Sequence, residues 1–168
     1  MERQKSADEH AVDLEGAAFE KTLAALPLES YRAGETILNA GSKTGRLLFL
    51  KRGAVVILKD AIEIGRVDEP GAVFGDLSAL LNLPHTAEVR ALSDSVFHVA
   101  DTAILRNDPT MMFHVARILA GRLVAANRGY VELKKCLEAG QSPGALRKLI
   151  DSVEETLSIS GSNFEQWV

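Results

Sequence analysis

The sequence predicts an α+β fold in which an antiparallel jelly-roll-type β-barrel is flanked by an N-terminal helix and a long C-terminal helix. Apolar residues follow helical spacing before Pro27, and short apolar runs separated by glycines occupy the region from Glu35 to Val99. A seven-residue apolar repeat begins after Asp108. The 168 residues are 46% hydrophobic and 25% charged, which is enough to bury the core of about one domain.

The first predicted element is a helix over residues 13–26. Residues 1–12 are polar, and we expect them to be flexible. Helical spacing then relates the apolar residues Leu14, Ala17, Ala18, Leu23 and Leu26. The helix must end before Pro27. We expect this helix and the strands after it to form one domain, residues 13–107.

Short apolar runs predict the strands of the barrel. They read ETILNAG, RLLFLKRG, AVVILKD, AIEIGRV, AVFG, AEVRAL and SVFHVA. Each has about four to seven residues rich in Val, Ile, Leu and Phe, and they recur roughly every 8–12 residues, as in antiparallel barrels and sandwiches. Turn formation explains nearly all of the glycines between the runs, and Gly75 is the exception.

A long helix is predicted over residues 108–138, with Pro109 in its first turn. Its apolar residues are separated by alternating intervals of four and three positions, the spacing of a coiled-coil seam. The seam consists of Met112, Ala116, Leu119, Leu123, Ala126, Tyr130, Leu133 and Leu137. A helix that packs only on a barrel needs a broader apolar stripe, so we expect this helix to pair with its copy in a homodimer. Packing on the barrel of the same chain is the alternative.

Residues 139–168 are predicted to form a linker, a short amphipathic helix and a tail. Glycine and proline in the segment AGQSPG end the long helix. One face of the short helix consists of Leu146, Leu149, Ile150, Val153 and Leu157. The polar tail contains Phe164 and Trp167, and Trp167 either folds back on its own domain or docks to a partner.

Charge and composition exclude several classes of protein. With 19 basic and 23 acidic side chains, the net charge of −4 argues against a protein that coats nucleic acid. The sequence has no run of about 18 apolar residues that could span a membrane, and its polar start is unlike a secretory signal. A single cysteine, Cys136, cannot form an internal disulfide, and the histidines lack metal-ligand spacing. We therefore expect a cytoplasmic protein without a metal site.

The segment from Phe74 to Leu92, FGDLSALLNLPHTAEVRAL, is the most informative part of the chain. A glycine ends a strand, a short helical turn follows, and a loop leads to the next strand. The first backbone N–H groups of such a turn can face an anion. Asp76 begins the turn, where its carboxylate either caps the helix or accepts a hydrogen bond from a ligand hydroxyl.

This segment resembles the phosphate-binding cassette of cyclic nucleotide-binding domains, which occur in the catabolite activator family and in cyclic-nucleotide-gated channels and kinases. The family pattern F-G-E-[LI]-x-L-L-x-x-x-P-R-[TS]-A-x-V-x-A corresponds to FGDLSALLNLPHTAEVRA here. The runs before it, GRLLFLKRGAVVILK and EIGRVDEPGAVFGD, are also similar to strands of the family. The resemblance covers about residues 14–138 and implies the same fold.

The resemblance also implies a ligand site. In the family, a glutamate at the position of Asp76 accepts from the ribose 2′-hydroxyl, and an arginine at the position of His85 pairs with the phosphate. Thr86 stands where the family places a Thr or Ser beside the phosphate or base, with Thr sometimes associated with guanine. The implied ligand-binding residues of the cassette are Phe74, Gly75, Asp76, Leu77, His85, Thr86 and Ala87. Those of the long helix, which would cover the base, are Leu123, Ala126 and Asn127.

Two of the cassette positions that differ from the family pattern are those whose side chains make charged contacts with the ligand in the family. Asp76 is one methylene shorter than glutamate. His85 replaces the permanent charge and bidentate geometry of arginine by an imidazole that is mostly neutral near pH 7. We expect binding to be weaker by roughly one to two orders of magnitude but not lost. A strand arginine could substitute as the phosphate partner, and the candidates are Arg46, Arg52, Arg66 and Arg90.

These features predict a stand-alone sensor that is not an enzyme. Transcription factors of the family carry a helix-turn-helix of about 60 or more residues after the dimer helix, whereas about 30 residues without a basic stripe follow Glu138. Direct DNA binding is therefore not expected. We expect binding of cAMP or cGMP, no obligatory cofactor, and regulation of a separate effector protein. The alternatives are a different or larger phosphorylated ligand, and a ligand-free scaffold for dimerisation and protein interaction.

Overall fold

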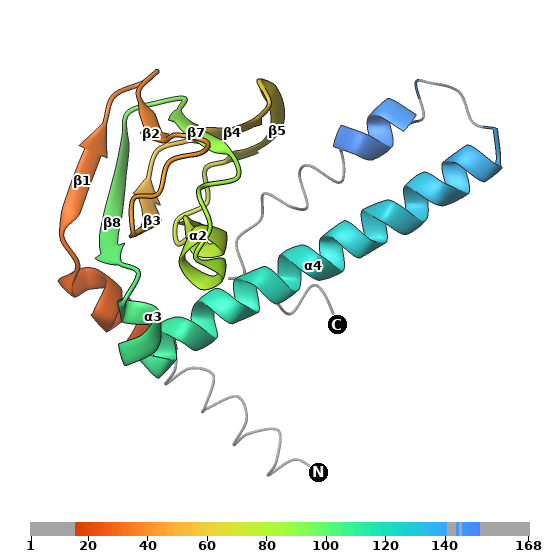
Figure 1. The fold of residues 1–168 in the computed structure, drawn as a ribbon. Helices are drawn as coiled ribbons and strands as arrows, with labels where there is room; N and C mark the ends of the chain where they lie inside the picture. The colour runs from red at the N-terminus through yellow and green to blue at the C-terminus, as the bar shows by residue number, and fades with distance from the viewer. Residues whose placement is uncertain (1–15, 141–143, 145, 152–168) are drawn as a thin grey trace, which may run out of the picture.

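The computed structural model describes residues 16–140, 144 and 146–151, and it contains two four-stranded antiparallel sheets (Figure 1). The first sheet has the order β1 (Leu28–Tyr31), β8 (Ser95–Asp101), β3 (Arg46–Arg52) and β6 (Val73–Phe74). The second has the order β2 (Thr36–Leu38), β7 (Glu88–Ala91), β4 (Val55–Lys59) and β5 (Ile62–Val67). Together with the flanking helices, these sheets confirm the predicted α+β class.

The strands form a roll of two sheets that are not closed into one barrel, in agreement with the predicted jelly-roll type of architecture. The edge strands are β1 and β6 in the first sheet and β2 and β5 in the second. β6 has only two residues, because the chain turns at Gly75 into the helix α2 (Asp76–Leu81) and leaves the sheet. This early turn places α2 next to β3, close to the long helix (Figure 1).

β3 is apolar on both faces because both faces are covered. Leu48 and Leu50 belong to the core between the two sheets, together with Phe97 of β8. Leu47 and Phe49 point to the other side of the sheet, into a second core that the helices complete. Since successive side chains of a strand alternate between its faces, this double burial explains the unbroken apolar run LLFL.

Helical segments cover the outer face of the first sheet. Residues 16–25 are helical, and their side chains Phe19 and Leu23 enter the second core. The predicted N-terminal helix is thus confirmed from residue 16 onward, while residues 13–15 lie outside the described part of the chain. A single turn that the sequence did not predict, α3 (Ile104–Asn107), leads into α4 (Pro109–Glu138).

α4 begins one residue after the predicted start of the long helix and ends at the predicted residue, Glu138. The side chain of Asp108 caps it by accepting a hydrogen bond from the backbone N–H of Met111 (3.1 Å). Its buried residues are Met111, Val115, Ile118, Ala125 and Gly129. Each of these lies one position before a member of the predicted seam, so the stripe that packs on the roll is a neighbour of that seam.

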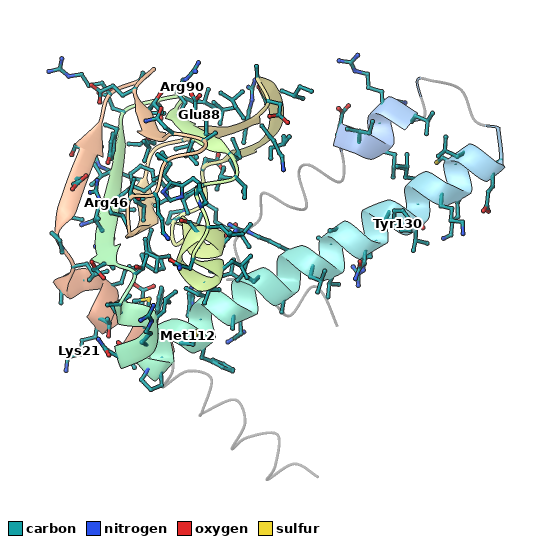
Figure 2. All side chains as sticks on the ribbon, in the orientation of Figure 1. Lys21, Arg46, Glu88, Arg90, Met112 and Tyr130 are labelled. Atoms are coloured by element: carbon teal, nitrogen blue, oxygen red, sulfur yellow. The ribbon has the colours of Figure 1, made fainter. Side chains whose placement is uncertain are left out.

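The predicted seam changes its environment along α4. Met112 and Leu119 pack partly against the second core, whereas Leu123, Tyr130 and Leu137 are 62%, 68% and 63% exposed. Figure 2 shows Met112 beside the roll and Tyr130 on the part of α4 that projects beyond the sheets. Packing within the chain therefore accounts for the first half of the repeat, and the homodimer stays a prediction.

Of the C-terminal residues 139–168, the structure describes 139, 140, 144 and 146–151. Residues 144 and 146–151 are helical, in agreement with a short helix after the linker, whereas the predictions for Phe164 and Trp167 concern residues outside the described ranges. No helix in the described ranges is long and apolar enough to cross a membrane. The division into residues 13–107, 108–138 and 139–168 stays a prediction.

Candidate ligand-binding site

Gly75 joins β6 to α2 in a conformation that favours glycine. Its φ is +85°, a value that side chains with a Cβ rarely adopt. A Cβ atom at this position would also clash with the backbone carbonyl oxygen of Arg46 on β3. The cassette therefore starts with its backbone pressed against the sheet, a close approach that is also found at Gly53 beside Ser95.

Asp76 is the first residue of α2, and its carboxylate does not cap that helix. Gly75 occupies the N-cap position without a side-chain hydrogen bond, which argues against the first of the two alternatives for Asp76, a helix cap. Instead, Asp76 Oδ1 accepts from the backbone N–H of Leu77 (3.0 Å), and Oδ2 accepts from Nη1 of Arg122 (2.7 Å). The carboxylate is buried, with Asp76 only 5% exposed, so the guanidinium compensates a charge withdrawn from water.

Arg122 reaches this position from α4, far away in the sequence. Its Nη2 donates to the backbone carbonyl of Val73 (3.0 Å), so one guanidinium binds both β6 and α2. Arg122 is not predictable as a site residue from the sequence, because its distance of 46 positions from Asp76 leaves no local pattern. The available signal was weak: Arg122 lies one position before the seam residue Leu123, on the stripe that faces the roll.

The arginines predicted as substitute phosphate partners lie elsewhere. Arg46, Arg66 and Arg90 form ion pairs with Glu29, Glu63 and Glu88, respectively. Figure 2 shows Arg90 and Glu88 close together on the second sheet, away from α4. None of these arginines lines the cavity beside the cassette, and neither does Arg52. The prediction of a strand arginine as the partner is therefore not supported.

His85 is held by the loop of residues 41–45. The imidazole Nε2 is 2.8 Å from the hydroxyl Oγ1 of Thr44, and the backbone of His85 exchanges hydrogen bonds with Gly41 and Ser42 (2.8 Å each). Burial lowers the pKa of His85 below its usual value. With 6% of the residue exposed, the side chain is a neutral, fixed group at neutral pH.

A cavity of about 230 Å³ lies between the cassette, the strands and α4. All seven cassette residues that the sequence predicts for ligand binding line it: Phe74, Gly75, Asp76, Leu77, His85, Thr86 and Ala87. The remaining lining residues are Leu38, Ile57, Ile64, Gly65, Val73, Ser78, Val89 and Arg122. One wall is thus polar and formed by the cassette with Arg122, and the other is largely aliphatic and formed by the second sheet.

The predicted cover of the base does not line this cavity. Leu123, Ala126 and Asn127 are exposed on α4, on the side of the helix that carries the seam, and only Arg122 among the α4 residues lines the cavity. A role for these residues in covering a base stays a prediction. Among the described residues, no group of three or more His, Cys, Asp or Glu side chains could hold a metal ion.

Comparisons with known proteins find matches for the region that contributes most of the residues around this cavity. Residues 28–107 match the family model described as the cyclic nucleotide-binding domain. The cGMP-dependent protein kinase egl-4 of Caenorhabditis briggsae is 29% identical over 75 residues. That match covers 45% of this chain and 10% of the kinase, so the chain spans a tenth of the length of this relative.

Solved structures of this kind share the fold. Thermus thermophilus catabolite activator protein is similar with a TM-score of 0.54 and 23% identity, covering 88% of this chain and 78% of that one. The regulatory domain of Toxoplasma gondii PKA, solved with cAMP, has a TM-score of 0.50 and 22% identity, covering 57% of this chain and 38% of that one. The predicted resemblance and the roll architecture are confirmed.

Proposed function

Residues 28–107 of this chain form a cyclic nucleotide-binding domain, and on this premise we propose that the chain binds cAMP or cGMP and regulates a separate effector protein. The ligand occupies the cavity between the cassette, the second sheet and α4. The bound ligand contacts α4 through the cavity wall, and the projecting part of α4 transmits its presence to the effector. The chain takes part in no reaction with the ligand.

The observation that carries this proposal is the gathering of all seven implied cassette residues around one cavity. Its volume of about 230 Å³ is somewhat below the range of small-molecule sites, which is roughly 300–1,000 Å³. A cavity blocked by the side chains of Asp76 or His85 would have favoured a site without a ligand. Both side chains instead lie in its wall.

The two walls suit the two ends of a cyclic nucleotide. The carboxylate of Asp76 can accept a hydrogen bond from a ribose hydroxyl, and the Thr86 hydroxyl can donate to a phosphate oxygen. Aliphatic side chains of the second sheet, among them Ile57 and Val89, offer an apolar surface for a base. Polar groups that fix orientation within a mainly apolar pocket are typical of ligand sites.

Calorimetric titration with cAMP and with cGMP, each at pH 6 and pH 8, tests the proposal. We expect saturable heat with at least one nucleotide. Ala87→Leu, which adds volume inside the cavity, should weaken that binding, while Ala120→Leu on the exposed side of α4 should leave it unchanged. Flat traces at millimolar nucleotide and both pH values would refute the function.

A ligand-free scaffold is the second candidate, and the exposed apolar residues of α4 favour it. Leu123, Tyr130 and Leu137 lie on one seam, mostly in solvent, and a second copy of α4 would bury them. Light scattering of Leu123→Asp tests this pairing, because the charge would separate a dimer into monomers. Ile62→Asp is a matched control on β5, where the apolar side chain is similarly exposed. Dimerisation together with no nucleotide response would favour the scaffold.

A further inference from the structure

The cavity contains one side chain of permanent positive charge among its described lining residues, and this side chain is Arg122. Asp76 is the corresponding negative side chain. A cyclic nucleotide carries one negative charge on its phosphate, and desolvating that charge requires a compensating cation or several hydrogen-bond donors. The cation available to a phosphate in this wall therefore comes from α4, which lies outside the cassette.

Arg122 retains donors that a ligand can use. A guanidinium has five N–H groups, and the contacts with Asp76 and Val73 engage one on each terminal nitrogen. Its side chain is 25% exposed and lines the cavity, so the group is accessible from within. The ion pair also fixes its direction, which lowers the entropy cost of forming a further hydrogen bond.

His85 is a poorer partner for the phosphate charge. Its Nε2 is occupied by Thr44 at 2.8 Å, and its backbone is bound by the loop of residues 41–45. One ring nitrogen thus remains for the cavity, where it can serve as a neutral donor. A neutral donor forms a weaker hydrogen bond with an anion than a guanidinium does.

We infer that Arg122 supplies the positive charge that binds the ligand's phosphate, in the place of the cassette arginine that this chain lacks. The inference rests on the proposed function, since it concerns the same ligand in the same cavity. A 3′,5′-cyclic nucleotide presents its 2′-hydroxyl next to the cyclic phosphate, so a donor and an anion lie side by side. Asp76 and Arg122 are the complementary acceptor and cation, already 2.7 Å apart.

This assignment gives the ligand a direct contact with the long helix. Leu123, the next residue along α4, belongs to the exposed seam, so the phosphate contact and the seam are adjacent on one rigid element. Binding at Arg122 holds this turn of α4 against the cassette. The ligand thereby stabilises one position of α4 relative to the roll, and only that preference can shift a conformational equilibrium.

A binding cycle that combines a protein change with a ligand change tests the assignment. Wild type and Arg122→Gln are titrated with cAMP and with its methyl phosphotriester, in which the phosphate is uncharged. For the wild type we expect a loss of about 10- to 100-fold in affinity when the phosphate is neutralised. For Arg122→Gln we expect that loss to shrink to less than about threefold, because the charge no longer has its partner.

Matched variants separate this role from others. Arg128→Gln removes an arginine of α4 that does not line the cavity, and His85→Gln removes the neutral donor; both should keep most of the wild-type dependence on phosphate charge. The inference would be overturned if neutralising the phosphate lowered the affinity of the wild type and of Arg122→Gln by the same factor. It would also be overturned if this loss of affinity disappeared in His85→Gln. If the wild type binds neither nucleotide, the proposed function is refuted together with the inference. If it binds but its charge dependence does not involve Arg122, only the inference fails.

Loss of the fold would not hide the result. Arg122→Gln leaves the carboxylate of Asp76 buried without its partner, so we pair it with the double variant Asp76→Asn/Arg122→Gln, whose two amides can hydrogen-bond to each other. Thermal unfolding establishes that the variant used is folded at the titration temperature. The ³¹P chemical shift of bound cAMP should change in Arg122→Lys and stay as in the wild type in Arg128→Lys; an unchanged shift in Arg122→Lys would contradict the contact.

Discussion

The two halves of α4 share one repeat of apolar residues but serve different purposes. In the first half, Met112 and Leu119 of this repeat pack partly against the second core, beside the buried stripe that contains Ile118. In the second half, Leu123, Tyr130 and Leu137 are largely in solvent. Arg122 lies between the halves and binds the cassette. The difference teaches that the buried side chains of the first half stabilise the fold, while the exposed seam residues of the second half are available for contacts with other molecules.

The largest expected effect comes from a cavity in the first half. Ile118→Ala should lower the free energy of unfolding by about 2–5 kcal/mol, because Ile118 is buried and its neighbours cannot collapse fully into the space. Leu137→Ala removes an apolar side chain from the second half and should change the unfolding free energy of the monomer by less than about 0.5 kcal/mol. Urea denaturation at low protein concentration measures both, and equal losses would contradict the comparison.

Acid should destabilise the first half through His114, which is stacked on Phe19 with ring centroids 3.5 Å apart. Burial, together with the nearby charge of Arg117, lowers the pKa of His114 to about 4. Below about pH 6.5 the unfolded chain binds a proton there that the folded chain does not, so stability falls as the pH drops toward 4, by up to about 3 kcal/mol.

His114→Phe tests this pH dependence because it keeps an aromatic ring beside Phe19 and cannot titrate. We expect the variant to lose less stability than the wild type between pH 7 and pH 4.5, as measured by thermal unfolding. His85 also has a lowered pKa, so some dependence of the same sign remains. An unchanged slope in His114→Phe would mean that the imidazole is not responsible.

Arg122 defines the border between the halves, and its removal should have an intermediate effect. Arg122→Gln should lower the free energy of unfolding by about 2 kcal/mol, less than the roughly 3–5 kcal/mol for fully buried pairs, because the guanidinium is partly in solvent. The double variant Asp76→Asn/Arg122→Gln should recover part of this loss, since it leaves no buried charge unpaired. A double variant less stable than the sum of the single changes would contradict this account.

The smallest effect is expected on the surface of the second half. Lys134 and Glu138 form an exposed ion pair one turn apart, with 3.9 Å between Nζ and Oε1. Lys134→Ala should change the free energy of unfolding by less than about 0.5 kcal/mol, because exposed pairs are screened by water and salt. A change above 1 kcal/mol in denaturant titrations would show that this half contributes to folding after all.

Local patterns in the sequence were sufficient to predict most strands and the cassette. The runs that became β3, β4 and β8 are apolar over several residues, and the cassette residues lie within one short segment. β1 was missed because Leu28–Tyr31 has only alternate half-buried residues and no apolar run. α3 was missed because a single turn has no period to detect.

Contacts between distant segments were beyond the reach of these patterns. The pairing of Arg122 with Asp76 depends on where α4 crosses the cassette, and the hydrogen bond between Thr44 and His85 depends on the path of a loop. The apolar repeat predicted as a seam did not indicate the buried stripe beside it, since two neighbouring stripes of one helix can both be apolar. Which stripe faces the roll is decided by tertiary packing.

The tight fit at Gly75 restricts how this pocket can diversify. The carbonyl oxygen of Arg46 fills the space where any larger residue would begin, so position 75 offers no room for adaptive change. New ligand preferences have to arise from the other walls, through exchanges at the aliphatic strand residues or at position 122 of α4. In descendants of this sequence, we expect variation to accumulate around a backbone turn that stays the same.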